Sequence, residues 1–539
     1  MNLATNIARF LPRVFLCASL LVSLGLAACG GSGTAPVPPP PTGNFSNANL
    51  KGQYAFSMSG SDVNGEFLAR VGSFTADGSG AITTGIEDVN TATSGQQLLP
   101  YSGGSYSVQA DGRGTISLTN ATGTVSFSIT LLSASQGIIV ETDPTTNLIA
   151  TASGTFIKQD PNSFATAGLS GNYVFDFSGL DFSGNTFGVP DSIVGQFVSN
   201  GNGGIASGLL DENDNAALVS AAPFTSATYQ LDSTNGPLFG RGTVTFTANG
   251  TNFNYAFYIV SGTRARMIEI NSTALTIGDA IAQTSVPATN TNFNGNFAFL
   301  MSGSGTGGAI TRIGRFSANG SGGLTNIAAD TNDTGTTAKV PDGSLSATTY
   351  SIDTNFPGTG RGIVTFTDSK LGTFQFVMYL SSSSGGVLQD ISANNVADGT
   401  LALQTGGAFT NATLAGDFGI GFSGVSSNSS TQAIGEEDYV GHITLSGAAS
   451  NNVTGAADFT EFSSNQGEFL NVLITGNGLT VGGDGTTSSG SRNALALRFN
   501  TAPSSTLNFV PYIVNSQTMF VAGTDSNRVI AGTVSVQAP

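Results

Sequence analysis

Acidic side chains recur at matched positions in this sequence. They follow the third predicted strand in each of four similar stretches, as Glu87 with Asp88, Asp211 and Glu212 with Asp214, Asp330 with Asp333, and Asp458 with Glu461. Two such carboxylates could supply the acid and base of a glycosidase, and several with backbone carbonyls could bind Ca²⁺. The flanking residues do not match a calcium loop. We therefore expect these acids mainly to pair locally or to cap backbone groups at strand ends.

A second recurring side chain is an arginine beside glycine, found as Arg113, Arg241, Arg361 and, in a looser match, Arg492. A guanidinium group can bind a carboxylate through two parallel hydrogen bonds. We predict that each arginine pairs with an acid of its own repeat, either the group after the third strand or a residue such as Glu141 or Glu269. Ligand binding is the alternative role for these arginines.

His442 is the only histidine, so a Ser-His-Asp or Cys-His device would have to use it. The matching positions in the other stretches are Ser73, Gln196 and Arg315, which favours a solvent-facing strand position over a catalytic one. With no second histidine, a typical transition-metal site is also disfavoured. The sequence therefore predicts no catalytic residue, no bound metal and no cofactor.

The elements that position these side chains belong to a fourfold internal repeat. Each repeat opens with a Gly-aromatic strand, and the glycines Gly52, Gly171, Gly295 and Gly416 stand about 120 residues apart. A second signature, VGSFTADGSG in its first copy, contains an Asp-Gly or Asn-Gly pair that predicts a type I′ hairpin. We expect a signal peptide at 1–28, a lipidated Cys and tether at 29–43, and repeats 1 to 4 at 44–160, 161–286, 287–406 and 407–539.

Strand-like alternation runs through every repeat. Phe253, Tyr255, Phe257 and Ile259 share one face of a predicted strand, and small or polar residues share the other. Repeat 1 contains eight strand candidates, near 53–58, 66–76, 80–89, 105–109, 114–119, 124–132, 136–142 and 148–157. Eight sequential antiparallel strands close most simply into an up-and-down barrel, so we predict an all-β chain of four tandem barrels. Two-sheet β-sandwiches are the alternative.

The N-terminus has the pattern of a secretory signal. Arg9 and Arg13 precede the apolar run Val14–Leu26, which is too short for an ordinary membrane span. The following Leu26-Ala27-Ala28-Cys29 resembles the lipobox of bacterial lipoproteins. The resemblance implies that Cys29 is acylated and becomes the new N-terminus. It also implies the outer membrane as the default location, because the next residue is Gly30 and not the Asp linked to inner-membrane retention. The segment from Gly30 to Gly43, rich in Gly and Pro, would be a tether.

The repeats resemble two families. The Gly-aromatic opening strand and the eight-strand plan resemble the lipocalin-like, or calycin, barrel, although no repeat has the tryptophan that usually opens a lipocalin. The repeat set also resembles uncharacterised Gly-rich repeat lipoproteins of soil bacteria. That resemblance implies a location in the cell envelope and brings no activity.

Composition narrows the function further. The formal charge of −17, with only 9% charged residues, argues against nucleic-acid binding, which needs clustered Lys and Arg. We expect a lipid-anchored protein, in contact with the membrane through its anchor, with a non-catalytic structural, adhesive or multivalent binding role. A carrier of small apolar ligands in the barrels is one alternative, although the 36 Phe residues favour filled interiors. A hydrolase using the acids after the third strand is the other.

Overall fold

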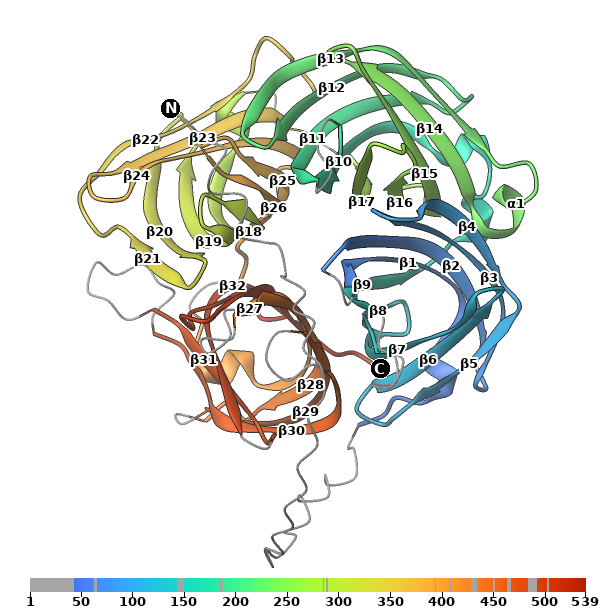
Figure 1. Ribbon diagram of the computed structural model, residues 1–539. Coiled ribbons are helices and arrows are strands. Elements are labelled where there is room, and N and C mark those ends of the chain that lie inside the picture. Colours follow the sequence, from blue (N-terminus) through green and yellow to red (C-terminus); the bar gives the residue numbers. More distant parts are fainter. Residues whose placement is uncertain are drawn as a thin grey trace, which may run out of the picture. The chain divides into compact units, whose positions relative to one another are not determined.

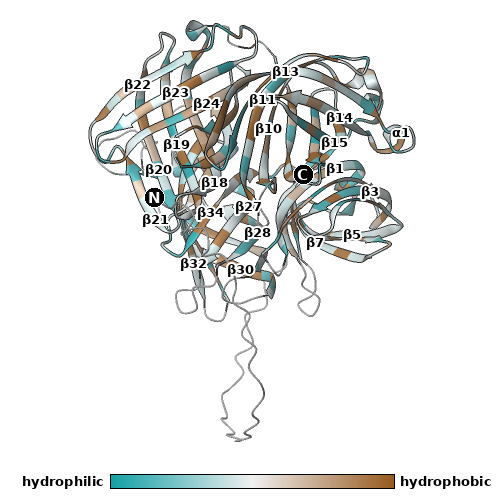
Figure 2. Cartoon of the chain, turned by 45° about the horizontal axis from the view of Figure 1, so that its top comes forward, coloured by the Kyte–Doolittle hydropathy of each residue, from teal (hydrophilic) through white to brown (hydrophobic). Residues whose placement is uncertain are grey.

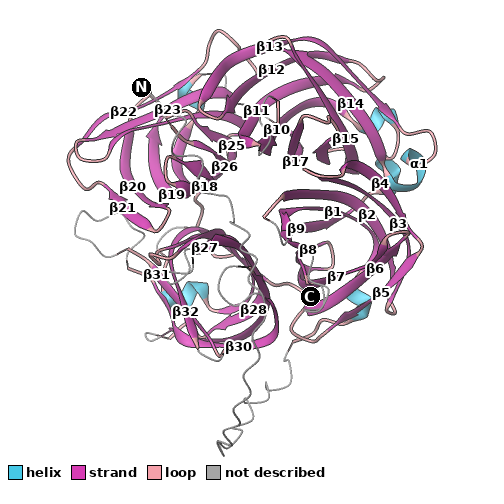
Figure 3. Ribbon diagram, in the orientation of Figure 1, coloured by secondary structure: helices cyan, strands magenta, loops and turns pink. Residues whose placement is uncertain are grey.

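The computed structural model describes residues 43–539 apart from 63–64, 143–149, 184–187, 285, 287–288, 393, 407–408, 428–433, 449–450, 463–466, 483–491 and 502–503. The predicted signal peptide, Cys29 and nearly all of the tether therefore lie outside the described residues. Residues Pro40–Pro539 form one compact unit. Strands dominate the described chain, with short helical turns between some of them (Figure 3). In the described ranges, no helix has the length and apolar character needed to cross a membrane.

The strands form four antiparallel sheets, one in each repeat (Figure 1). Repeats 2 and 4 are closed barrels of eight strands in sequence order. Eight strands also close in repeat 1, because β2 pairs with β3 and β3 pairs with β5, while β4 extends from β3. Repeat 3 is an open sheet of nine strands. The predicted fold class, all-β with tandem antiparallel barrels, is confirmed.

In repeat 1 the elements are η3 (Asn47–Asn49), β1 (Lys51–Asp62), β2 (Phe67–Asp77), β3 (Ala81–Thr91), β4 (Gly95–Tyr101), β5 (Gly103–Val108), β6 (Arg113–Asn120), β7 (Gly123–Ser133), β8 (Gln136–Glu141) and β9 (Ala150–Lys158). Between the first two sheets lie η4 (Pro161–Ser163) and η5 (Thr166–Gly168). In repeat 2 they are β10 (Ser170–Asp181), β11 (Val189–Asn200), β12 (Ile205–Asp214), β13 (Ala217–Leu231), α1 (Gly236–Phe239), β14 (Arg241–Ala248), β15 (Thr251–Ser261), β16 (Arg264–Glu269) and β17 (Ala274–Ala282).

In repeat 3 the elements are η6 (Asn290–Asn292), β18 (Asn294–Gly305), β19 (Gly308–Asn319), β20 (Leu324–Asp333), β21 (Thr336–Val340), β22 (Leu345–Ile352), β23 (Arg361–Asp368), β24 (Gly372–Ser382), β25 (Gly385–Asp390) and β26 (Val396–Leu403). In repeat 4 they are η7 (Asn411–Leu414), β27 (Gly416–Ser427), β28 (Ile434–Leu445), β29 (Asn451–Glu461), β30 (Gly467–Thr480), β31 (Ala494–Phe499), β32 (Ser505–Asn515), β33 (Thr518–Gly523) and β34 (Arg528–Val536).

The extra strand in repeats 1 and 3 comes from a division of the fourth strand. In repeat 2 this strand is the continuous β13, which pairs with both β12 and β14. In repeat 3 it divides into β21 and β22 at Pro341, which has no N–H to donate to a ladder. In repeat 1 it divides into β4 and β5, and our strand candidates missed β4.

Apolar side chains fill the barrel interiors. In repeat 2, Phe175, Tyr255 and Phe257 lie in one buried cluster with the inward side chains of the neighbouring strands. The rings of Phe175 and Phe177 stack with centroids 4.8 Å apart. Polar and apolar residues alternate along the strands (Figure 2), and the alternation gives each sheet an inner apolar face. Comparable clusters fill the other repeats.

The turns after the second strands differ from the prediction. Gly78 has a φ of 87° and Gly201 one of 73°, but neither Asp77 nor Asn200 has a positive φ, so the predicted type I′ geometry is wrong. Instead the Asp77 carboxylate accepts hydrogen bonds from the backbone N–H groups of the three residues after Gly78. This local bonding stabilises a longer turn, as Asp and Asn side chains commonly do.

Candidate functional site: polar junctions between repeats

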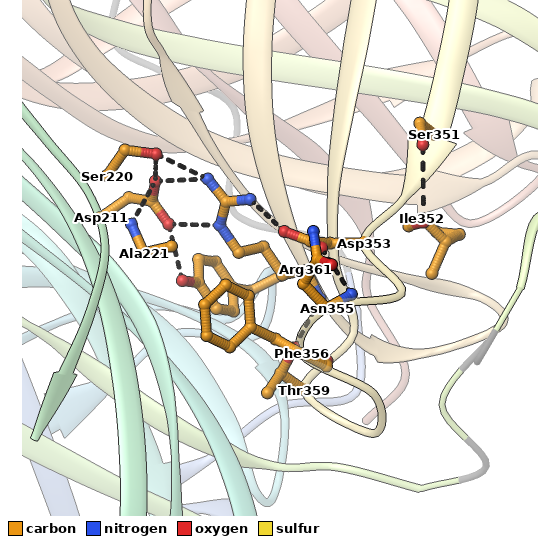
Figure 4. A network of polar contacts seen from close by, with 11 residues as sticks. Asp211, Ser220, Ala221, Ser351, Ile352, Asp353, Asn355, Phe356, Thr359 and Arg361 are labelled. Carbon is orange, nitrogen blue, oxygen red and sulfur yellow. Dashed lines mark hydrogen bonds and ion pairs between the residues drawn. The ribbon is translucent and has the colours of Figure 1, made fainter.

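The recurring acids and arginines meet where one repeat packs on the next. Figure 4 shows this at Asp211, on β12 of repeat 2, and Arg361, at the start of β23 of repeat 3. The Arg361 Nε donates to Asp211 Oδ2 at 2.8 Å and Nη2 donates to Oδ1 at 2.7 Å. Asp211 is 2% exposed and Arg361 is 6% exposed. The contact is therefore a buried, two-pronged ion pair, the strongest form of this interaction.

Other groups complete the hydrogen bonding of the Asp211 carboxylate. The Tyr379 hydroxyl donates to Oδ2 at 2.6 Å, and the Ser220 hydroxyl donates to Oδ1 at 3.1 Å. Tyr379 also belongs to an apolar cluster with members from both repeats, including Val194 and Leu209. Burial and the Asp211 charge raise the pKa of Tyr379 well above its ordinary value, so the phenol remains a donor. The carboxylate thus has a partner for each oxygen, as a buried charge requires.

The same arrangement recurs at the junction before this one, between repeats 1 and 2, and at the junction after it, between repeats 3 and 4. Arg241 of repeat 2 holds Asp88 of repeat 1 through two hydrogen bonds of 2.8 Å, and the Tyr258 hydroxyl donates to Asp88 at 2.7 Å. Burial lowers the pKa of Arg241, but the hydrogen bonds and charge of Asp88 outweigh this effect and raise it. In repeat 4, Arg492 and the Tyr512 hydroxyl both donate to Asp330 of repeat 3.

The fourth junction joins repeat 4 back to repeat 1 and is looser. Arg113 Nη1 lies 4.0 Å from Asp458 Oδ1 and donates to Asn471 Oδ1 at 2.9 Å. In repeats 2 and 3 a tyrosine lies opposite the arginine on the adjacent strand. In repeat 1 the residue opposite Arg113 is Thr130, so this junction lacks the phenol donor. The contacts nevertheless form a closed cycle, in which each repeat touches the one before it and the one after it.

Arg113, Arg241 and Arg361 each pair with an acid of their own repeat, as predicted, but the acids named for this role were wrong. For Arg113, Arg241 and Arg361, the partner in the same repeat is a different residue from the turn just before the arginine. These partners are Asp111 at 2.9 Å, Asp232 at 2.9 Å and Asp353 at 2.6 Å. The reason is geometric: Asp88, Asp211, Asp330 and Asp458 point outward from their own sheet, where the neighbouring repeat reaches them.

Glu87 and Glu212 do not belong to these junctions, although each is adjacent to a junction aspartate. Successive side chains of a strand point to opposite faces, so Glu87 points inward when Asp88 points outward. Glu87 binds Arg70 at 3.2 Å inside repeat 1. Glu212 lies inside repeat 2, where burial raises its pKa to about 7. The predicted acidic pairs are thus divided between two environments.

Sequence reasoning missed a glutamine that follows the last strand of each repeat. The Gln159 side-chain amide donates to two backbone carbonyls of repeat 2, those of Phe239 at 3.0 Å and Ile259 at 2.7 Å. Gln283 and Gln404 make the matching contacts to the repeats that follow them, and Gln537 makes them to repeat 1. The signal was present in the sequence, because a glutamine directly follows the last strand of each repeat.

An asparagine two residues after the junction aspartate was also missed. Asn90, Asn213 and Asn332 donate to backbone carbonyls of the following repeat at 2.8, 2.9 and 2.9 Å. In repeat 4 the matching residue is Thr460, whose hydroxyl donates to the Glu141 carbonyl of repeat 1 at 3.1 Å. Each junction therefore combines an arginine, an aspartate, a glutamine and one further polar side chain.

His442 is buried rather than solvent-facing, so that expectation is wrong. It is 6% exposed, and its Nε2 lies 3.2 Å from the Asp417 carboxylate. The matching residues Ser73, Gln196 and Arg315 are buried too. They lie on the outward face of the second strand, which the neighbouring repeat covers, as the packing of Val440 on Ile138 and Val140 of repeat 1 shows.

A cavity of about 490 Å³ lies beside the junction of repeats 2 and 3 and is lined mainly by residues of these two repeats. Arg266 in its wall is 4% exposed, and its Nε has no hydrogen-bond partner among the described residues. Burial lowers the pKa of Arg266 to about 10. A water molecule in the cavity would satisfy this donor.

The part of the chain that the structure describes contains no group of three or more His, Cys, Asp or Glu residues arranged to hold a metal ion. No family model matches the chain, and no curated protein sequence matches it. Solved structures similar to it include transferrin binding protein B, described as a vaccine antigen, from Haemophilus parasuis, with 9% identity over 77% of this chain and 86% of that one, at a TM-score of 0.20. The isotype 1 protein of Neisseria meningitidis serogroup B covers 76% of this chain and 82% of its own, with 9% identity and a TM-score of 0.20. TM-scores this low carry no argument about function.

Proposed function

We propose that this chain is a lipid-anchored protein of the cell envelope and that its four repeats act together as a non-catalytic scaffold for binding partners outside the cytoplasm. Cys29 carries the lipid, and the segment after it connects the lipid to the repeats. The outer membrane is the expected location, because the residue after the lipidated cysteine is Gly30 and not the Asp linked to inner-membrane retention.

The observation that supports a scaffold is the use of the recurring charged residues. Asp88, Asp211 and Asp330 are buried and bound by arginine and tyrosine of the adjacent repeat. Such ion pairs fix the geometry of a contact, because breaking one leaves an uncompensated buried charge. Side chains held in this way serve the contact between repeats and leave no free carboxylate pair at these positions for hydrolysis.

A carrier role in the barrel interiors receives less support. The inner faces of the described strands meet in clusters of Phe, Tyr, Leu and Ile that are almost fully buried. In an eight-stranded barrel, the interior holds either packed side chains or one small ligand. The packed aromatic rings occupy the space that an apolar ligand would need.

The anchor is tested by producing the full chain, with its own N-terminus, in a Gram-negative host beside a Cys29→Ala variant. We expect mass spectrometry to find acyl chains on Cys29 and the wild-type protein to sediment with membranes. The variant should remain in the soluble fraction. A wild-type protein that is unmodified and soluble would contradict the anchor.

The scaffold is tested by small-angle X-ray scattering on the full chain without its lipid. Replacing Asp88, Asp211 and Asp330 together by Asn should increase the radius of gyration, because the repeats separate at three junctions. Asp342→Asn, which alters an exposed ion pair with Lys370, is the matched control and should leave the radius unchanged. Equal radii for the triple variant and the control would contradict the proposal.

A further inference from the structure

The interiors of the four repeats differ in how buried carboxylates are neutralised. In repeat 1, Arg70 binds Glu141 at 3.1 Å and Glu87 at 3.2 Å. In repeat 3, Arg312 lies 2.8 Å from Asp390. In repeat 4, Arg528 binds Glu437 at 3.0 Å. Each of these repeats therefore supplies its own guanidinium group to its inward-facing acids.

Strand registers show which residues of repeat 2 occupy the same positions. A glycine of the second strand faces an apolar residue of the first in every repeat, as Gly72 faces Phe56 and Gly195 faces Phe175. The residue two positions before this glycine is Arg70 in repeat 1 and Arg312 in repeat 3, but it is Ile193 in repeat 2. On the last strand, Ala274 stands where repeat 4 has Arg528. Both arginine positions are thus filled by uncharged residues in repeat 2.

The acids of repeat 2 are retained nevertheless. Glu269 faces Tyr255 as Glu141 faces Phe127 in repeat 1. Asp191 stands four residues before Gly195, as Glu437 stands four residues before Gly441. Glu212 and Asp214 add two further carboxylates to the same inner face, and Asp214 pairs with Asp191 across the strands. Like charges in such a cross-strand pair repel each other.

Hydrogen bonding leaves part of this group unsatisfied. Asp191 is 5% exposed, and its Oδ1 has no hydrogen-bond partner among the described residues, as is also true of Asp214 Oδ1. Glu269, by contrast, accepts hydrogen bonds from the Thr276 hydroxyl at 2.6 Å and from the Asn271 amide at 3.0 Å. Burial, followed by the charge of Glu212, raises the pKa of Asp191 well above its ordinary value. A buried, unpaired acceptor of this kind is costly unless a donor reaches it.

We propose that the end of the repeat 2 barrel, formed by Asp191, Glu212, Asp214 and Glu269, binds an organic cation with a guanidinium group. The ligand takes the place that arginine side chains hold in the other three repeats. Glu212 and Asp214 are partly exposed, so the group is accessible from solvent while Asp191 lies deeper. A guanidinium group fits because its planar donors can bind two carboxylates at once, as Arg70 does in repeat 1.

The test is calorimetric titration of the full chain with arginine amide, which has the guanidinium group and lacks a carboxylate. We expect one binding site in the wild-type protein. Asp191→Asn should weaken binding by about tenfold or more, since one charge-assisted hydrogen bond is worth that much. Ile193→Arg should abolish binding by placing a guanidinium group inside the barrel. Asp333→Asn, at the position in repeat 3 that matches Asp214, is the control and should bind like the wild type.

Three results would overturn the proposal. These are the absence of binding to the wild-type protein, equal affinity in Asp191→Asn, and tighter binding of calcium ions than of arginine amide. Thermal unfolding of each variant shows whether it is folded. Should Ile193→Arg fail to fold, Asp191→Asn with its control decides the matter alone.

Discussion

Replacing Asp211 by Asn at the junction between repeats 2 and 3 should have a large effect on stability. The substitution keeps the size of the side chain but removes the charge that Arg361 and Tyr379 bind. It also turns one acceptor into an NH₂ group facing these donors. Among the described residues, Asp353, at 2.6 Å, is then the charged partner that Arg361 keeps.

The magnitude follows from the burial of the pair. Breaking a buried ion pair by removing one partner costs about 3–5 kcal/mol, and the remaining contact with Asp353 places this case near about 3 kcal/mol. A domain typically has about 5–15 kcal/mol of stability in total. For a domain of this size, a loss of about 3 kcal/mol lowers the melting temperature by roughly 10 °C.

Differential scanning calorimetry of the full chain measures this effect. We expect the melting temperature of the transition that includes repeats 2 and 3 to fall by roughly 10 °C in Asp211→Asn. Asp342→Asn should change the free energy of unfolding by no more than about 1 kcal/mol, because its ion pair is exposed. The double variant Asp211→Leu with Arg361→Met should recover much of the loss, since apolar residues can replace a buried pair. If Asp211→Asn and Asp342→Asn melt alike, the buried pair does not stabilise the junction and our reasoning is refuted.

Further predictions concern the closing contact, the filled interiors and the acids of repeat 2. Gln537→Ala removes two hydrogen bonds to repeat 1, so hydrogen exchange in β6 and β7 should accelerate. Gln97→Ala, at an exposed side chain on β4, is the control and should leave exchange in β6 and β7 as in the wild type. Phe127→Ala empties part of the repeat 1 core and should cost about 3–5 kcal/mol in denaturant titration; a cost below about 1 kcal/mol would indicate a loosely filled barrel. Burial raises the pKa of Glu212 from 4.5 to about 7, so the folded state binds a proton that the unfolded state has released, and stability should fall as pH rises from about 4.5 to about 7. Ile193→Arg should reduce this slope, and an unchanged slope would show that Glu212 and its neighbours do not titrate in that range.

The sequence was sufficient to predict the strand plan but not the environment of the polar residues. Alternation in segments such as Phe253–Ile259 identified the inward face, because burial inside a barrel selects large apolar side chains at every second position. The opposite face was harder to interpret. Tyr258 looked like an ordinary outward residue but is fully buried against repeat 1. A single strand pattern records which residues share a face and cannot record what covers that face.

The same limit explains the errors at the arginines and at His442. Arg361 and Asp211 stand 150 residues apart, and nothing in either local pattern links them. Only the packing of whole repeats brings them together. The repeated Gln159, Gln283, Gln404 and Gln537 were the readable evidence of such packing, since a polar residue kept directly after the last strand of every unit points to a contact between units.

The bond from Gln537 to the first repeat has a consequence for the number of units in the chain. Each unit presents one face to its successor and a different, complementary face to its predecessor, which is a head-to-tail mode of association. Such a mode either closes on itself or extends without limit. Four units in one polypeptide complete the circuit, so both faces of every unit are occupied. A gene that lost one unit would encode a protein with two complementary faces left open, and we expect it to form dimers or longer chains rather than a smaller version of the same molecule.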